Sequence, residues 1–201
     1  MGFYPQKATG NIQSDVDGTN LDRGFIAHFQ VTAANAVAAS TTGVHAAVTD
    51  NGAAQTVTTG ITNPAVPRNI TATSGGTATD IKAVQVVVTG TNINDEVITE
   101  TLPAFTENSA TTVVGSKAFK TVTSIAIPAH DGTGATTAIG WGDKLGLPYK
   151  RAHIPCIASF LNNVLEATAA AVTASATAFE SNTIDLNSAL NGTVVDTYLV
   201  V

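Results

Sequence analysis

The chain has 201 residues, a formal net charge of −6 and only 12% charged residues, about half the usual share for a soluble domain. This composition argues against a nucleic-acid-binding protein, which would need a basic patch to neutralise phosphates. A chain of this length can bury about 70% of the surface that its unfolded state exposes, so it needs neither a disulfide nor a metal to hold a core. The single cysteine, Cys156, lies in an apolar stretch and is interpreted as a buried, inert thiol.

Residues 1–24 differ from the rest of the chain, because they are polar, rich in Gly, Asn, Asp and Gln, and contain only isolated apolar side chains. This pattern predicts an extended arm that a partner orders. The N-terminus lacks the apolar core of a secretory signal, and Gln6 stands where a myristoylation site needs Ser or Thr. No apolar run is long enough to span a membrane. The expectation is a protein made in a cytoplasm, with no membrane partner.

The first half of the body is predicted to form β-strands from Phe25 onward. In residues 25–31, Phe25, Ala27, Phe29 and Val31 alternate onto one face. Residues 33–60 are rich in Ala and Thr and weakly patterned, and the two prolines in residues 63–67 indicate a rigid connection. Three strands follow, with turns at residues 74–76 and 90–95 between them and the last two forming a hairpin; they cover residues 68–73, 81–89 and 96–102.

The second half continues in the same style, with turns predicted at residues 131–134 and 140–143. Strands are expected at residues 111–114, 119–127, 135–139, 183–186 and 193–201. Residues 157–167 and 169–179 fit either strand or helix, because Ala favours helix while the interleaved Thr and Val favour strand.

Short strands separated by Gly, Asn and Pro turns are typical of an antiparallel fold. The sequence therefore predicts an all-β protein, an antiparallel β-sandwich or barrel-like domain with an extended N-terminal arm. The arm covers residues 1–24 and the β-rich body residues 25–201. The body is one unit or a core sandwich over residues 25–150 followed by C-terminal strands over residues 151–201.

Threonine occurs 32 times in the chain. A β-branched residue with a hydroxyl group suits a strand that has one face half exposed to water, because it offers both a methyl group and a hydrogen bond. The low charge also removes the repulsion that keeps soluble monomers apart. Together these features favour a protein that packs into an assembly over a monomeric sandwich with a Thr-rich exterior.

No motif in the sequence predicts catalysis or cofactor binding. The carboxylates of residues 15–22 do not fit the calcium-loop pattern. The four histidines lack metal-ligand spacing, and no Gly-x-Ser-x-Gly elbow or phosphate loop is present. Glu96 and Glu100 would lie about 13 Å apart along one strand, too far for a glycosidase pair. We therefore expect a non-enzymatic protein without cofactor, metal site or catalytic residues.

Four segments resemble a class of tailed-bacteriophage virion protein described as head decoration, capsid cement or minor structural proteins. They carry the sequences NPAVPRNI, VTGTN followed by VITETL, KAFKTVTSI, and GDKLGLP; their ranges are residues 63–70, 88–102, 117–125 and 142–148. The order and spacing of the segments carry the resemblance, and residues 181–201 are also similar to such proteins.

The resemblance implies a structural protein of the virion, on the capsid exterior, that binds the major capsid protein where capsomers meet and stabilises the capsid against internal DNA pressure. Such proteins are often homotrimers. The arm is expected to add strand pairing to the shell, through its apolar residues Phe3, Tyr4, Ile12 and Val16.

A contact between subunits is expected at the apolar residues of a turn-rich segment, namely Trp141, Leu145, Leu147 and Tyr149. The alternative function is a tail or head-fibre module that binds a host-surface glycan, with Trp141 as the sugar platform. Its weakness is the aromatic content of only 5%, since sugar platforms depend on ring faces. The third class, a hydrolase, has no support in the motifs.

Overall fold

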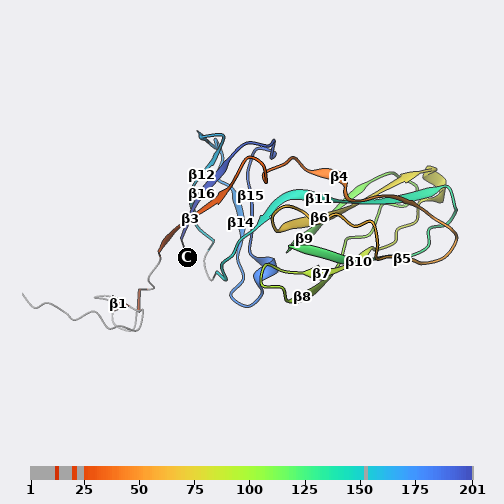
Figure 1. Ribbon diagram of the computed structural model, residues 1–201, viewed down its shortest axis with the longest axis horizontal. Coiled ribbons are helices and arrows are strands. Elements are labelled where there is room, and N and C mark those ends of the chain that lie inside the picture. The colour runs from red at the N-terminus through yellow and green to blue at the C-terminus, as the bar shows by residue number, and fades with distance from the viewer. Residues whose placement is uncertain (1–11, 14–19, 22–24, 152–153, 201) are drawn as a thin grey trace, which may run out of the picture.

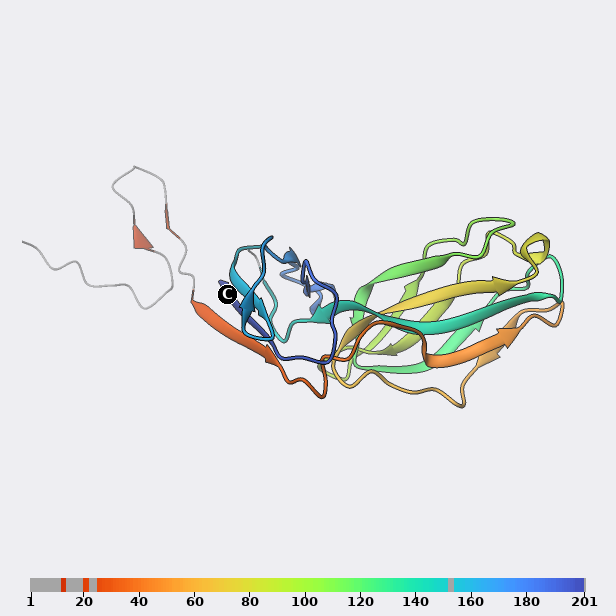
Figure 2. The same ribbon diagram turned by 90° about the horizontal axis from the view of Figure 1, so that it is seen from above.

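The computed structural model describes residues 12–13, 20–21, 25–151 and 154–200. The described chain is built from antiparallel strands and two single-turn 3₁₀ helices, which confirms the predicted all-β fold. Figures 1 and 2 show an elongated molecule with two lobes, one at the end where the described N-terminal and C-terminal strands lie and the other at the far end.

The central sheet runs through both lobes, and β11 is its longest strand. The strand order is β14 (Ala171–Thr173), β15 (Thr183–Asp185), β11 (Ala135–Gly146), β6 (Arg68–Gly76) and β9 (Thr112–Phe119), and β4 (Ser40–Thr49) also pairs with β11.

A second sheet packs against the central sheet in the lobe far from the termini, which we call the sandwich lobe. Its strand order is β5 (Gln55–Val57), β10 (Thr121–Ile127), β7 (Val87–Thr91) and β8 (Val97–Thr101). The inward side chains of both sheets form the first core, which includes Ile70, Val88, Phe119, Ile125 and Ile139. This packing of two antiparallel sheets is the predicted sandwich.

A third sheet forms the other lobe, which we call the terminal lobe. Its strand order is β13 (Val164–Leu165), β12 (Cys156–Leu161), β16 (Val195–Val200) and β3 (Ile26–Val31). A separate core beneath it includes Val31, Leu145, Ile184, Val195 and Leu199. A division into residues 25–150 and 151–201 is therefore wrong at its N-terminal side, because β3 pairs along its whole length with β16.

The remaining described elements are short. In the predicted arm, β1 (Ile12–Gln13) pairs with β2 (Asn20–Leu21). The 3₁₀ helices are η1 (Ala78–Asp80) and η2 (Phe179–Ser181). Of the two segments that fitted helix or strand, residues 157–167 contain most of β12 and all of β13, and residues 169–179 contain β14 and the start of η2; neither contains an α-helix.

Two glycines in β11 correct the predicted turn at residues 140–143. The Ser40 carbonyl oxygen of β4 occupies the place where a Cβ at Gly140 would project, and the Asn69 amide lies 2.6 Å from the ideal Cβ position at Gly142. Both positions require glycine because a Cβ atom would collide with these neighbouring groups, and not because the chain turns there. The strand continues through both residues and joins the two cores.

Other predicted boundaries also shift. Residues 74–76, predicted as a turn, belong to β6, and residues 81–86, predicted as strand, precede the start of β7. The predicted hairpin is present as β7 and β8. In β10 the pairing register shifts between Val122 and Ser124, so Val122 and Ile125 are both buried and strict alternation fails.

Threonine pairs join neighbouring strands across the sheets. The Oγ1 atoms of Thr91 and Thr121 lie 2.7 Å apart, and those of Thr73 and Thr112 lie 2.9 Å apart. Each pair places one hydrogen bond between strands that are already paired by the backbone. The threonines thus occupy the half-exposed strand positions that the composition predicted.

His130 is a buried histidine of the sandwich lobe, and it gives the stability of the fold a pH dependence. Its Nδ1 accepts a hydrogen bond from the Lys82 amide at 3.2 Å, and its Nε2 lies 3.0 Å from the Thr137 hydroxyl. Burial lowers the pKa of His130, although the carboxylates of Asp50 and Asp131 oppose the shift.

The unfolded chain therefore binds a proton on His130 at a higher pH than the folded chain does. The stability that the neutral ring contributes is fully present above about pH 6.5, the ordinary histidine pKa, and is lost as the pH falls from there toward the lowered pKa. Urea unfolding at a series of pH values is expected to show this fall. His130→Gln should flatten the profile in that window; an unchanged slope would contradict the assignment.

Candidate functional site

Exposed apolar side chains are concentrated on the terminal lobe. Ile26 is 69% exposed and Leu165 60% exposed, although both lie in or beside strands. We call the set the terminal-lobe surface, and its members are Phe25, Ile26, Ile154, Ile157, Val164, Leu165 and Tyr198. Concentrated exposed apolar side chains are typical of protein interaction sites.

The alternation of β3 explains how this surface arises. Ala27, Phe29 and Val31 point toward the second core, as the sequence predicted, and Ile26 and His28 therefore point outward. Phe25 lies before the strand and is exposed, which corrects its place on the inner face. The outward face of β3 therefore carries apolar as well as polar side chains. A strand face that was only in contact with water would be mostly polar.

Aromatic rings connect three strands on the outward face. The rings of His28 in β3 and Tyr198 in β16 stack with centroids 4.9 Å apart. Tyr198 also meets Phe160 of β12 edge-on at 6.3 Å. Such ring pairs contribute stability beyond the area that they bury, so they hold this face in a defined shape.

The polar groups beside these rings are paired. Asp196 of β16 lies 2.8 Å from His28 Nε2 and accepts a hydrogen bond from Gln30 Nε2 at 2.8 Å. A partner that covered this part of the sheet would therefore bury a carboxylate that already has hydrogen-bond donors.

The sandwich lobe carries fewer exposed large apolar side chains among the described residues. Val97 in β8 is 76% exposed and Val114 in β9 is 47% exposed, but they come from different sheets. Single exposed apolar residues of this kind are normal on a folded protein. The terminal lobe is therefore the side of the molecule with the chemistry of an interface.

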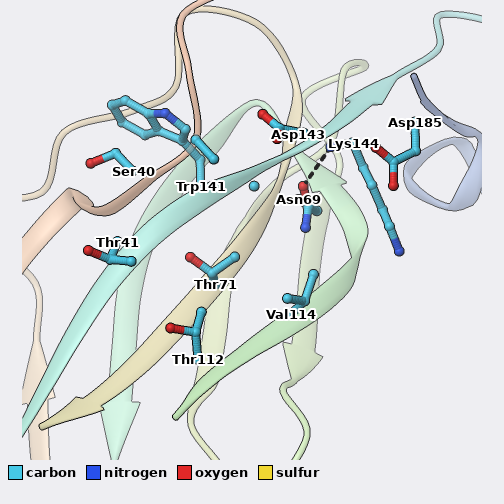
Figure 3. Close-up of a pocket in the computed structure, with 12 residues that line it drawn as sticks. Ser40, Thr41, Asn69, Thr71, Thr112, Val114, Trp141, Asp143, Lys144 and Asp185 are labelled. Atoms are coloured by element: carbon cyan, nitrogen blue, oxygen red, sulfur yellow. Dashed lines mark hydrogen bonds between the residues drawn. The ribbon is translucent and has the colours of Figure 1, made fainter. Parts of the chain in front are cut away.

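A pocket lies where β11, β6 and β9 run side by side (Figure 3). It has a volume of about 360 Å³. One wall comes from residues 39–41 and another from Asp185 of β15. Its other lining residues are Asn69, Thr71, Thr112, Val114, Trp141, Gly142, Asp143 and Lys144.

Charged side chains of both signs lie at one end of the pocket. The buried Arg68 guanidinium donates to Asp143 Oδ1 at 3.2 Å, and burial lowers the pKa of Arg68 while Asp143 opposes the shift. Burial also raises the pKa of Asp185; Lys144 opposes this shift and Asp143 adds to it. Lys144, Asp143 and Asp185 thus line one edge of the pocket, and the buried Arg68 beside Asp143 brings the formal charge of the group to zero.

The predicted subunit contact is wrong for two of its four residues. Leu145 is 0% exposed and Leu147 is 1% exposed, and both belong to the second core. Their place in a turn-rich segment suggested exposure, but β11 continues into the terminal lobe and buries Leu145 there. Neither side chain is available to another subunit in this structure.

The other two residues are half-buried. Trp141 packs against the first core, its Nε1 donates to the Ala38 carbonyl oxygen at 3.2 Å, and its ring lies over Gly43. Tyr149 lies just beyond the end of β11. Trp141 therefore has a structural role within the chain, and a subunit contact at these two residues stays a prediction.

The predicted arm contacts fall mainly on residues that the structure does not describe. Phe3, Tyr4 and Val16 lie outside the described residues. Ile12 begins β1, where it pairs with Leu21 of β2. The arm contacts remain predictions.

Cys156 is half-buried at the start of β12, and burial raises the pKa of its thiol. The described residues contain no group of three or more His, Cys, Asp or Glu side chains placed to hold a metal ion. They also contain no helix that is long and apolar enough to cross a membrane.

The terminal-lobe surface was not found from the sequence. The outward position of Ile26 follows from the alternation of residues 25–31, but the pairing of β3 with the C-terminal strand β16 does not. The pocket was missed because its lining comes from five separate strands or connections. No protein-family model, no curated protein and no solved structure matched this chain.

Proposed function

We propose that this chain is a non-enzymatic structural protein of a bacteriophage virion that attaches to the outside of the capsid and stabilises it. The observation that carries the attachment is the terminal-lobe surface, where seven large apolar side chains are exposed on one lobe. The resemblance of the hairpin segments to head decoration proteins supplies the identity of the assembly, with the major capsid protein as partner.

Attachment through the terminal lobe has a physical rationale. Removing exposed Ile, Leu and Phe side chains from water contributes roughly 1.5–3 kcal/mol for each side chain that becomes fully buried. The aromatic contacts of His28, Tyr198 and Phe160 hold the outward face in shape before binding, so less conformational entropy is lost when a partner docks. The sandwich lobe would then project from the shell.

The predicted arm fits the same orientation. The described chain enters the terminal lobe at Phe25, immediately before β3. Residues 1–24 therefore join the body on the lobe that we propose to face the capsid. Assembly as a homotrimer and contacts of the arm with the shell are further parts of the proposal.

The proposal is tested by replacing two exposed residues of the terminal-lobe surface and measuring how well the variant binds capsid shells. The double variant Ile157→Lys/Leu165→Lys is expected to abolish cosedimentation with shells assembled from the major capsid protein of the same genome, because two charges would have to be desolvated at the contact. Both side chains are more than half exposed, so the folded monomer should keep its stability.

Val97→Lys is the matched control, because Val97 is 76% exposed on the sandwich lobe. This variant should bind shells as the natural chain does. Equal binding by the double variant, or loss of binding by the control alone, would contradict the proposed orientation. Failure of the natural chain to bind any shell would contradict the function itself.

A further inference from the structure

We propose that the pocket between β4, β6, β9, β11 and β15 binds a neutral, hydroxyl-rich ligand of the sugar class. This function goes beyond attachment to a capsid. The pocket shares no residue with the terminal-lobe surface, so a sugar could be bound while the terminal lobe is covered.

Thr71 is the first observation that points to a ligand. This residue of β6 is only 5% exposed and lines the pocket, where Figure 3 shows it between Asn69 and Thr112. Among the described residues its hydroxyl group has no hydrogen-bond partner, whereas the neighbouring Thr73 bonds Thr112. A hydroxyl group that faces a pocket and has no protein partner can both donate a hydrogen bond to a ligand and accept one from it.

Further hydrogen-bonding groups of the pocket are also free. Asp143 uses Oδ1 for Arg68, which leaves Oδ2 as an acceptor. The side chains of Asp185 and Lys144 make no hydrogen bond to other described residues, and Figure 3 shows them close to one another at one end of the pocket. Carboxylates accept hydrogen bonds from ligand hydroxyl groups, and an ammonium group donates to them.

Asn69 stiffens the floor of the pocket instead of offering free groups. Its Oδ1 accepts from the Lys144 amide at 3.0 Å, and its Nδ2 donates to the Gly115 carbonyl oxygen at 3.2 Å. These bonds tie β6 to β11 and β9, so Thr71 and Asp143 keep their positions. A site that is formed in advance loses less entropy on binding.

The charge balance selects a neutral ligand over an ion. Arg68 and Lys144 offset Asp143 and Asp185, so a cation or an anion would meet as much repulsion as attraction. A neutral ligand with several hydroxyl groups can use both the acceptors and the donor. The volume of about 360 Å³ lies at the small end of ligand sites, which range over roughly 300–1,000 Å³.

An apolar wall completes the site. Val114 is 47% exposed beside the pocket, and Trp141 lines it from β11. Sugars present C–H faces as well as hydroxyl groups, and an apolar or aromatic wall removes those faces from water.

The experiment uses the full chain and a panel of methyl glycosides: glucoside, mannoside, galactoside and N-acetylglucosaminide. Trp141 is the only tryptophan of the chain and lines the pocket, so a change in tryptophan emission reports a change at or beside the pocket. We expect at least one glycoside to change the emission saturably in the millimolar range. In amide NMR spectra the same glycoside should shift the signals of Thr71, Thr112 and Lys144.

Thr71→Val keeps the shape of the side chain and removes the hydroxyl group. It should weaken the binding of that glycoside about fivefold to tenfold, as expected for one lost hydrogen bond. Thr89→Val, which removes a hydroxyl from the other sheet, should leave binding unchanged. Absence of saturable change with every glycoside, equal binding by Thr71→Val, or a response only to the cationic probe lysine methyl ester would overturn the proposal.

Discussion

Replacement of Arg68 by methionine is expected to lower the free energy of unfolding by about 3–5 kcal/mol, the range for breaking a buried ion pair from one side. Arg68 is only 1% exposed. Its Nε donates to the Gly142 carbonyl oxygen at 2.7 Å and its Nη1 to the Val37 carbonyl oxygen at 2.7 Å. Methionine fills similar space but leaves both carbonyl groups and the Asp143 carboxylate without this donor.

Because of its position, the loss of Arg68 should destabilise both lobes of the protein. Arg68 connects β6 to β11 and to the segment between β3 and β4, which links the terminal lobe to the sandwich lobe. Urea unfolding followed by circular dichroism should show one transition shifted to lower urea. If the Arg68→Met variant instead showed two transitions, one for each lobe, the result would mean that Arg68 makes the two lobes unfold together.

Lys82→Met is the matched control for the loss of a cation. Lys82 also forms an ion pair, with Asp131 at 3.0 Å, but both side chains are about half exposed. Exposed pairs contribute only about 0–1 kcal/mol. Equal effects of Arg68→Met and Lys82→Met would show that the hydrogen bonds of Arg68 do not stabilise the fold.

Replacement of Leu145 by alanine is expected to cost about 2–5 kcal/mol of stability, the range for a large-to-small change in a core. Leu145 is 0% exposed in β11, where it pairs with Ile184 of β15 in the second core. Removal of its side chain leaves a cavity between the central sheet and the terminal-lobe sheet.

The dependence on protein concentration separates this explanation from a subunit contact. If Leu145 belongs to the core of one chain, the loss of stability should be the same at low and high protein concentration. A residue at a subunit contact would give a loss that grows with dissociation. Val97→Ala, at an exposed position, should change the free energy of unfolding by no more than about 0.5 kcal/mol.

The sequence by itself determined the fold class and the character of the strand faces. Alternation identified the inward residues Ala27, Phe29 and Val31 and the hairpin that became β7 and β8. These features are local, because the position of a side chain on one face of a strand follows from the period of two. The threonine content likewise predicted half-exposed strands. In the structure, threonines such as Thr91 and Thr121 pair across neighbouring strands at part-buried positions.

Local patterns failed where a distant segment decided the outcome. Gly140 suggested a turn, but glycine is needed there because the Ser40 carbonyl group approaches the strand. The strand consequently continues, and it carries Leu145 into a core that the sequence around it did not reveal. In β10 a bulge after Val122 changed the side on which later residues lie.

Only the tertiary structure decided where the candidate sites lie. Pairing of β3 with β16 brings residues from opposite ends of the chain into one sheet, and this places Ile26, Tyr198 and Ile157 on the same lobe. The pocket likewise exists only because β11 lies beside β6 and also pairs with β15, which carries Asp185. Strand pairing between distant segments depends on the packing of the whole chain, whereas alternation depends on neighbouring residues alone. The sequence could therefore predict what each strand is like and which neighbours along the chain form a hairpin, whereas the structure was needed to show which distant strands meet.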